Sequence, residues 1–224
     1  MIEAIVEAWE FIARRPELLI EWALAHIVLI VVAIVIAVPL GIIMGIYISG
    51  SGREKIADTV LYLAEIMMTI PSLALFGLLM FILGAIGLTT IGFLPAVIAL
   101  IVYGQLPILR NTYTAIQTVD SAMIEAGRGM GMNGRQLLFK IQLPLAVPII
   151  MAGLRNSIVL IIGITAIAAL IGAGGLGTPI FRGLRNARMD LIVIGGIGVS
   201  ILALLIDGFM AMVERWAIPK GLKK

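Results

Sequence analysis

The feature that most constrains this chain is a stretch of 44 residues, 66–109, without a single charged side chain. About 20 consecutive apolar residues are enough to cross the hydrocarbon core of a bilayer, so this stretch is too long for one crossing. Only 13% of the 224 residues are charged, whereas an ordinary soluble domain has about 25%. The sequence therefore predicts an integral membrane protein.

The uncharged segments predict about five crossings. Gly84, Gly87 and Gly92 interrupt the longest one around Thr89 and Thr90, which indicates a hairpin of two spans. No segment alternates as a spanning strand would, so we expect an all-α protein with about five transmembrane helices. Span one is assigned to residues 27–48, and the hairpin of spans two and three to residues 66–109. Span four is assigned to residues 156–181 and span five to residues 191–206. Gly41 and Gly45, one turn apart, predict close helix packing in the first span.

Residues 1–21 are typical of an amphipathic helix. The apolar side chains at helical spacing, opposite Glu3, Glu7 and Glu10, are Ile2, Ile5, Val6, Trp9, Ile12 and Ala13. Such a helix either lies along the membrane surface or packs against the other helices.

The distribution of basic residues predicts the orientation. With five spans, one side of the membrane holds ten lysines and arginines and the other holds five. The richer side should be cytoplasmic, which puts the N-terminus outside and the C-terminus in the cytoplasm. Arg155 is not assigned to a side, because it falls at the start of the fourth span and needs a partner or water there.

Composition excludes several function classes. The net charge of +3 is too small for a groove that follows nucleic acid. The chain has no cysteine and one histidine, His26, so neither a metal cluster nor a catalytic constellation is expected. It also lacks the glycine-rich phosphate loop of ATPases, so we expect no cofactor, and any ATP must be bound by another subunit.

The polar segment 110–147, between the third and fourth spans, has more pattern than a connector needs. Asp120 is placed to cap a short helix through Glu125. Asn133 and Gln136 resemble a capping box that opens a second short helix, which should stop before Pro144. Two short helices joined by a glycine turn would protrude and suit a groove on a partner protein.

The same segment resembles the signature loop, E-A-A-x3-G-x9-I-x-L-P, of permease subunits of binding-protein-dependent ABC importers. It departs from that pattern once, with glycine in place of the second alanine. The matching residues are Glu125, Ala126, Gly127, Gly131, Ile141, Leu143 and Pro144. The resemblance implies the type I importer fold over one transmembrane permease domain, residues 1–224. It also implies that the loop is a cytoplasmic coupling helix that docks into an ATP-binding subunit.

Further stretches resemble the osmoprotectant branch of that family, whose substrates include glycine betaine, carnitine and choline. They are residues 69–75, 106–113, 129–132 and the glycine-rich 169–177. The resemblance implies an ATPase dimer, a second permease subunit that is the same chain or a paralogue, and an extracytoplasmic solute-binding protein as partners. Methionine permeases carry a similar glycine run, so a methionine or other amino-acid permease is the alternative within the superfamily.

Two further classes stay open. A proton-coupled secondary carrier is one, because Glu65, His26 and Asp207 lie at or within apolar segments, where ionisable groups are functional candidates. A purely structural membrane protein is the other, but it leaves the patterned segment 110–147 unexplained.

Overall fold

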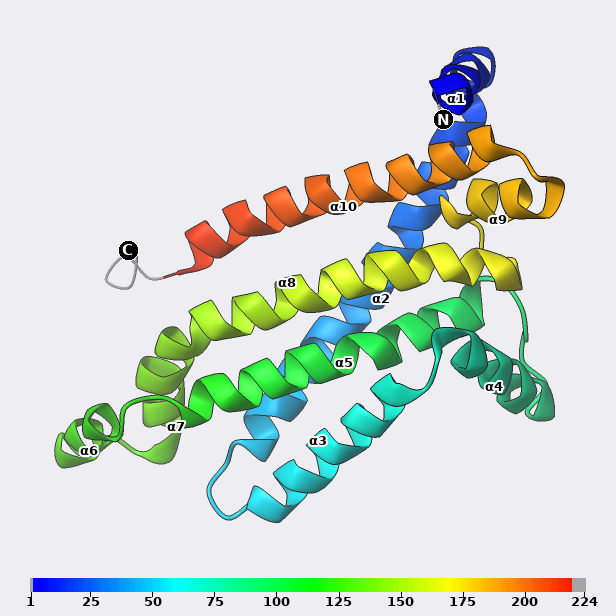
Figure 1. Ribbon diagram of the computed structural model, residues 1–224. Coiled ribbons are helices and arrows are strands. Elements are labelled where there is room, and N and C mark those ends of the chain that lie inside the picture. Colours follow the sequence, from blue (N-terminus) through cyan, green and yellow to red (C-terminus); the bar gives the residue numbers. More distant parts are fainter. Residues whose placement is uncertain (1, 219–224) are drawn as a thin grey trace.

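The computed structural model describes residues 2–218, and within them every regular element is a helix (Figure 1). The prediction of an all-α membrane protein with about five spans is confirmed. Four segments are long and apolar enough to cross a bilayer, and a bent pair of helices makes the fifth. They are α2 (Pro16–Ile48), the pair α3 (Glu54–Thr69) and α4 (Ser72–Ala85), α5 (Phe93–Gln117), the segment Gly134–Ile171, and α10 (Met189–Ala217).

The shorter elements lie at the two ends of these spans. They are α1 (Ile2–Arg14), α6 (Ser121–Gly129), α7 (Gly134–Leu137) and α9 (Gly177–Asn186). A π-helical turn, Leu138–Gln142, joins α7 to α8 (Leu143–Ala168), and a 3-10 turn, Ala169–Ile171, extends α8.

The core forms where α2 and α8 pack against α5. Leu100 and Ile161 are fully buried there, and Phe76 of α4 covers them. The predicted close contact of Gly41 and Gly45 is confirmed. A Cβ on Gly41 would lie 2.5 Å from Ile108 of α5, and one on Gly45 would lie 2.6 Å from Thr112. Small residues therefore let two spans approach where lipid provides little drive for association.

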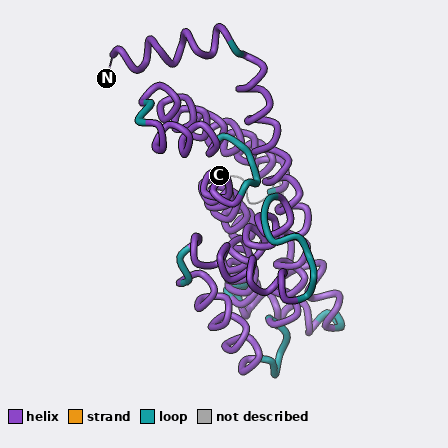
Figure 2. The backbone as a smooth tube through the Cα atoms, turned by 90° about the vertical axis from the view of Figure 1, so that its right-hand side faces the viewer, coloured by secondary structure: helices purple, strands orange, loops and turns teal. Residues whose placement is uncertain are grey.

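The N-terminal helix is shorter than the predicted 1–21, because α1 ends at Arg14 and Pro16 begins α2. A residue before proline is pushed out of the helical region, and Arg15 is not helical (φ −139°, ψ 59°). After this break α1 runs across the direction of α2 (Figure 2). The predicted packing against the other helices is confirmed for one face, where Ala8 is buried, while Trp9 on another face is 72% exposed.

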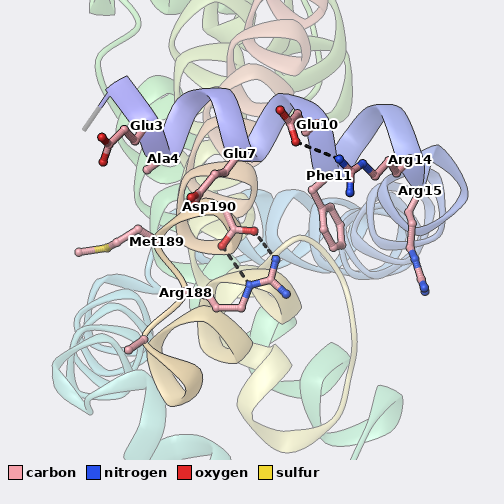
Figure 3. Close-up of a pocket in the computed structure, with 11 residues that line it drawn as sticks. Glu3, Ala4, Glu7, Glu10, Phe11, Arg14, Arg15, Arg188, Met189 and Asp190 are labelled. Carbon is pink, nitrogen blue, oxygen red and sulfur yellow. Dashed lines mark hydrogen bonds and ion pairs between the residues drawn. The ribbon is translucent and has the colours of Figure 1, made fainter.

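A cleft separates α1 from the turn between α9 and α10 (Figure 3). Arg188 in that turn donates a hydrogen bond of 3.1 Å to Asp190, and its guanidinium lies 5.6 Å from the ring centre of Phe11 in α1. The hydrogen bond to Asp190 raises the pKa of Arg188. The turn is thus held beneath α1 by a permanently charged side chain.

The second span is bent by 103° between α3 and α4, which the sequence did not predict. Ile70 precedes Pro71 and is extended, so the helix is interrupted. The Tyr103 hydroxyl of α5 donates a hydrogen bond to the Ile70 carbonyl. The Ile70 carbonyl, which the break leaves without a partner inside the helix, therefore accepts a hydrogen bond from Tyr103 instead.

The predicted fourth span, 156–181, has the wrong boundaries at both ends. Its helix starts earlier, because the chain stays helical from Gly134 to Ile171 instead of stopping before Pro144. The Leu143 amide reaches back five residues to the Leu138 carbonyl, and Pro144 follows at the second position of α8. A π turn and an early helix position both accommodate a residue without an amide hydrogen. At the other end the glycine run after Ile171 separates α8 from α9.

The loops gather at two opposite ends of the helices (Figure 1). One end holds the turn after α2, the helices α6 and α7, and the last turn of α10. The other end holds α1, α9 and the loop after α4, where the Gly92 amide donates to the Ile171 carbonyl over 2.7 Å. The count of basic residues on each side assumed five spans with alternate loops at the same end, and the loops are grouped in this way.

Candidate functional site

Residues 120–144, called the coupling segment below, project from one end of the helices (Figure 1). Its first helix, α6, begins where the Asp120 carboxylate accepts a hydrogen bond of 2.9 Å from the Ala122 amide, so the predicted N-cap is confirmed. The predicted capping box is also confirmed. The Asn133 and Gln136 side chains each accept a backbone hydrogen bond of 2.9 Å from the other residue. Both helix starts are therefore fixed by side chains.

The turn between the two helices depends on Gly131. Its φ is +78°, a left-handed conformation that costs other residues strain. This conformation lets the Met132 amide return to the Gly127 carbonyl over 3.1 Å, while the Gly131 amide bonds to the Arg128 carbonyl over 2.9 Å. The chain thus reverses within a few residues and keeps its backbone groups paired.

Gly127, the one departure from the family pattern, lies in the interior of the coupling segment. A Cβ at this position would lie 2.6 Å from a Leu137 methyl and 2.7 Å from an Ile141 methyl. Leu137 is only 6% exposed. The glycine therefore lets α6 lie directly on the start of the long helix, and the departure tightens the contact between the two.

The exposed surface of the coupling segment combines charged side chains of both signs, among them Glu125, with apolar side chains. Glu125 and Ala126 are exposed, and Glu125 forms no ion pair with any residue that the structure describes. Met123, Met130 and Phe139 are 48%, 70% and 64% exposed. A protruding surface of this kind suits insertion into a groove on a protein partner.

The seven motif residues take different positions in the structure, with Gly131 in the turn described above. Glu125 and Ala126 face outward, whereas Gly127 and Ile141 meet in the interior. Ile141, Leu143 and Pro144 are half-buried where the coupling segment passes into α8. Among residues 2–218 no group of three or more histidine or acidic side chains is placed to hold a metal ion.

The structure also gives Arg155 a partner. Its guanidinium, in α8, bonds to the Asp207 carboxylate in α10, with one bond of 2.5 Å, and lies 3.8 Å from Glu214. A charged side chain in an apolar span is costly unless it is paired. Sequence reasoning named Arg155 and Asp207 but did not join them. The pair could have been suspected from the sequence, because two apolar runs carry side chains of opposite charge.

The groups behind the carrier hypothesis are also engaged. Glu65 of α3 forms an ion pair with Arg110 of α5. The His26 ring accepts a hydrogen bond from the Leu176 amide at Nδ1, so Nε2 carries the proton and donates to the Ile162 carbonyl, both over 3.2 Å. These contacts join helices, and they give the three side chains a structural role.

The fold is that of membrane subunits of type I ABC importers. The methionine ABC transporter MetNI in inward-facing conformations matches with a TM-score of 0.80 at 23% identity, covering 92% of this chain and 99% of that one. An amino-acid ABC transporter matches with a TM-score of 0.77 at 21% identity, covering 91% and 96%. Identities this low define the fold alone.

The chain belongs to the family described as the binding-protein-dependent transport system inner membrane component, whose model matches residues 37–218. It is 43% identical, over 76% of each chain, to the permease protein of a glycine betaine/carnitine/choline transport system of Bacillus subtilis (strain 168). It is 44% identical to a carnitine transport permease of Listeria monocytogenes, covering 76% and 75%. It is 40% identical to an osmoprotectant import permease of Salmonella typhimurium, covering 75% and 78%. The resemblance predicted from the motifs is therefore confirmed, and the chain is a multi-pass permease of the inner membrane.

Proposed function

We propose that this permease carries quaternary ammonium osmoprotectants such as glycine betaine, carnitine or choline. The observation that carries the proposal is the identity of 40% to 44% with three permeases named for these solutes or for osmoprotectants, over about three quarters of the chain. The methionine importer shares the fold at 23% identity, which does not select a solute. The proposal therefore prefers quaternary ammonium compounds to amino acids.

We infer that the coupling segment docks into a separate ATP-binding subunit. Its protrusion, its fixed turn and its exposed Glu125 support this role, with Glu125 facing a basic or amide group of the ATPase. Leu143 and Pro144 join the docked part to α8, so movement of the ATPase dimer would be carried into a span. ATP is bound and hydrolysed by that partner, and this chain contributes neither a cofactor site nor catalysis.

Five spans do not enclose a gated path alone. We infer a pair of permease subunits, identical or paralogous, with an ATPase dimer on the coupling segments and a solute-binding protein at the opposite end. Seven of the ten basic residues counted on one side lie within residues 2–218, at the end with the coupling segment, against five at the other end, and this excess supports a cytoplasmic position for the coupling segment and an N-terminus outside. Alternation of inward-facing and outward-facing states would then move the solute.

The test uses the assembled transporter. The permease, its cognate ATPase and its binding protein are reconstituted in proteoliposomes, and uptake of radiolabelled glycine betaine, carnitine, choline and methionine is measured with ATP inside. We expect uptake of at least one quaternary ammonium compound and none of methionine. Methionine uptake with no response to the three quaternary compounds would overturn the solute class and leave the family membership standing.

A further inference from the structure

A small hollow opens at the end of the molecule opposite the coupling segment. It has a volume of about 310 Å³ and lies between the start of α2, the glycine run after α8, and α9. Pockets for small ligands begin at about 300 Å³, so its size suits a solute of a few heavy atoms. Neither the predicted coupling role nor the ion pairs between spans involve this hollow.

The hollow carries opposite charges on opposing elements. Glu21 lines it from α2, while Arg182 and Arg185 line it from α9. All three side chains are exposed, and no ion pair joins Glu21 to either arginine among the residues that the structure describes. The two arginines are three positions apart, so they lie on one face of their helix. Charges of both signs therefore line one hollow without neutralising each other.

The base of the hollow is held in place by contacts beneath it. Trp22 is 5% exposed and stacks on Phe11 with ring centres 6.3 Å apart, while the Arg182 guanidinium lies 6.0 Å from the Trp22 ring. A Cβ on Gly175, whose φ is +84°, would lie 2.9 Å from the His26 ring. The glycine run thus lies flat on α2, and a side chain there would displace it from its bond to His26.

We propose that this hollow is an entry subsite for zwitterionic quaternary ammonium solutes on their way into the permease. Arg182 and Arg185 receive the carboxylate of the solute, and Glu21 faces its trimethylammonium group. Guanidinium groups are suited to carboxylates because they present several donors in a plane. The trimethylammonium group donates no hydrogen bond, so a nearby carboxylate attracts it through charge alone.

This inference takes its class of solute from the proposed function. It also distinguishes solutes that have a carboxylate from those that lack one, which the proposed function does not. Glycine betaine and carnitine have a carboxylate, but choline has none. The arginines should therefore matter for the first two solutes and not for choline, whereas Glu21 should matter for all three.

The experiment measures KM for glycine betaine and choline in proteoliposomes that contain the cognate ATPase and binding protein. In Arg185→Gln we expect KM for glycine betaine to rise about tenfold, since a charge-assisted hydrogen bond is lost, while KM for choline stays the same. In Glu21→Gln both KM values should rise. Arg185→Lys should recover part of the loss, because it keeps the charge.

Arg14→Gln is the matched control, because Arg14 lies in α1 at the same end of the molecule but pairs with Glu10 outside the hollow. We expect it to leave both KM values unchanged. Equal effects of Arg185→Gln on both solutes, or no effect on either, would overturn the subsite. Equal effects would point instead to altered docking of the binding protein. A wild-type transporter that takes up no quaternary ammonium compound would overturn the proposed function, and with it the solute assigned here.

Discussion

Arg155 and Asp207 lie 52 positions apart in the sequence and are joined by two hydrogen bonds between α8 and α10. Glu214, farther along α10, lies 3.8 Å from the same guanidinium. One positive and two negative side chains thus meet between two spans that otherwise present apolar surfaces. Removing the guanidinium would leave two carboxylates between these spans without their cationic partner.

We therefore predict that Arg155→Leu destabilises the permease more than the double variant Arg155→Leu with Asp207→Leu. The single variant leaves two carboxylates, Asp207 and Glu214, without the guanidinium that contacts both, whereas the double variant leaves only Glu214. The measurement is the melting temperature of the purified permease in detergent. A double variant that melts below the single variant would show that the pair does not carry the contact between these helices.

Gly131 offers a test of the turn in the coupling segment. Gly131→Val should cost about 1–2 kcal/mol, because valine is strained at positive φ, and should reduce solute-stimulated ATPase activity of the assembled transporter. Asparagine tolerates this conformation, so Gly131→Asn should lose less. Gly129 is not at positive φ, and a Cβ there meets nothing within 4 Å, so Gly129→Val is the control. Normal activity in Gly131→Val would refute a strict need for this turn.

Gly127 tests the contact between α6 and the long helix. Gly127→Leu should loosen that contact by about 1–3 kcal/mol, because it overfills the space beside Leu137 and Ile141. Adding Leu137→Ala makes room and should restore part of the solute-stimulated ATPase activity. The Cβ of Gly127→Ala would come within 3 Å only of two methyl groups at the ends of flexible side chains, so this variant should be tolerated far better. If Gly127→Leu stimulates the ATPase like the wild type, the packing described here is not needed for coupling.

Tyr103 tests the bend between α3 and α4. Tyr103→Phe removes the hydroxyl that pairs the Ile70 carbonyl and should destabilise the permease by about 1–3 kcal/mol. Tyr62→Phe is the control, because the Tyr62 side chain is 63% exposed. Thermal unfolding in detergent compares the two variants. Equal melting temperatures would mean that water satisfies the Ile70 carbonyl.

The absence of cysteine from the sequence allows a direct test of orientation. Single cysteines at Thr89 and Thr178 should react with a reagent that cannot cross the membrane, applied to intact cells. Cysteines at Ser51 and Asn133 should react only after the membrane is opened. Labelling of Asn133→Cys from outside would contradict both the orientation and the coupling role of its segment.

Local signals in the sequence were enough to predict the number of spans and the starts of α6 and α7. A span is set by the length of an apolar run, and caps such as Asp120 and Asn133 act on amides two or three residues away. The coupling motif itself was also readable, because its residues lie within one short segment.

Features that depend on distant parts of the chain were not predictable in the same way. The proline at 144 predicted a helix end, but the π turn before it and the packing of Leu137 on Gly127 keep the chain helical. The pairing of Arg155 with Asp207 and the joint hollow of Glu21 with Arg182 require knowledge of which helices are neighbours. Apolar runs alone do not specify neighbours, because almost any two spans have similar surfaces.

The helical segment Gly134–Ile171, which includes the π turn and the 3-10 turn, connects the coupling segment to the opposite end of the molecule. Its 38 residues span about 57 Å at 1.5 Å per residue, so a tilt of about 3° about one end moves the other by about 3 Å. One end carries the buried contact of Leu137 with Gly127, and the other leads directly into the glycine run that lines the hollow. A displacement of about 3 Å is enough to break a hydrogen bond. If the coupling segment docks and the hollow binds solute as proposed above, a small tilt at one end would therefore change the shape of the solute site at the other.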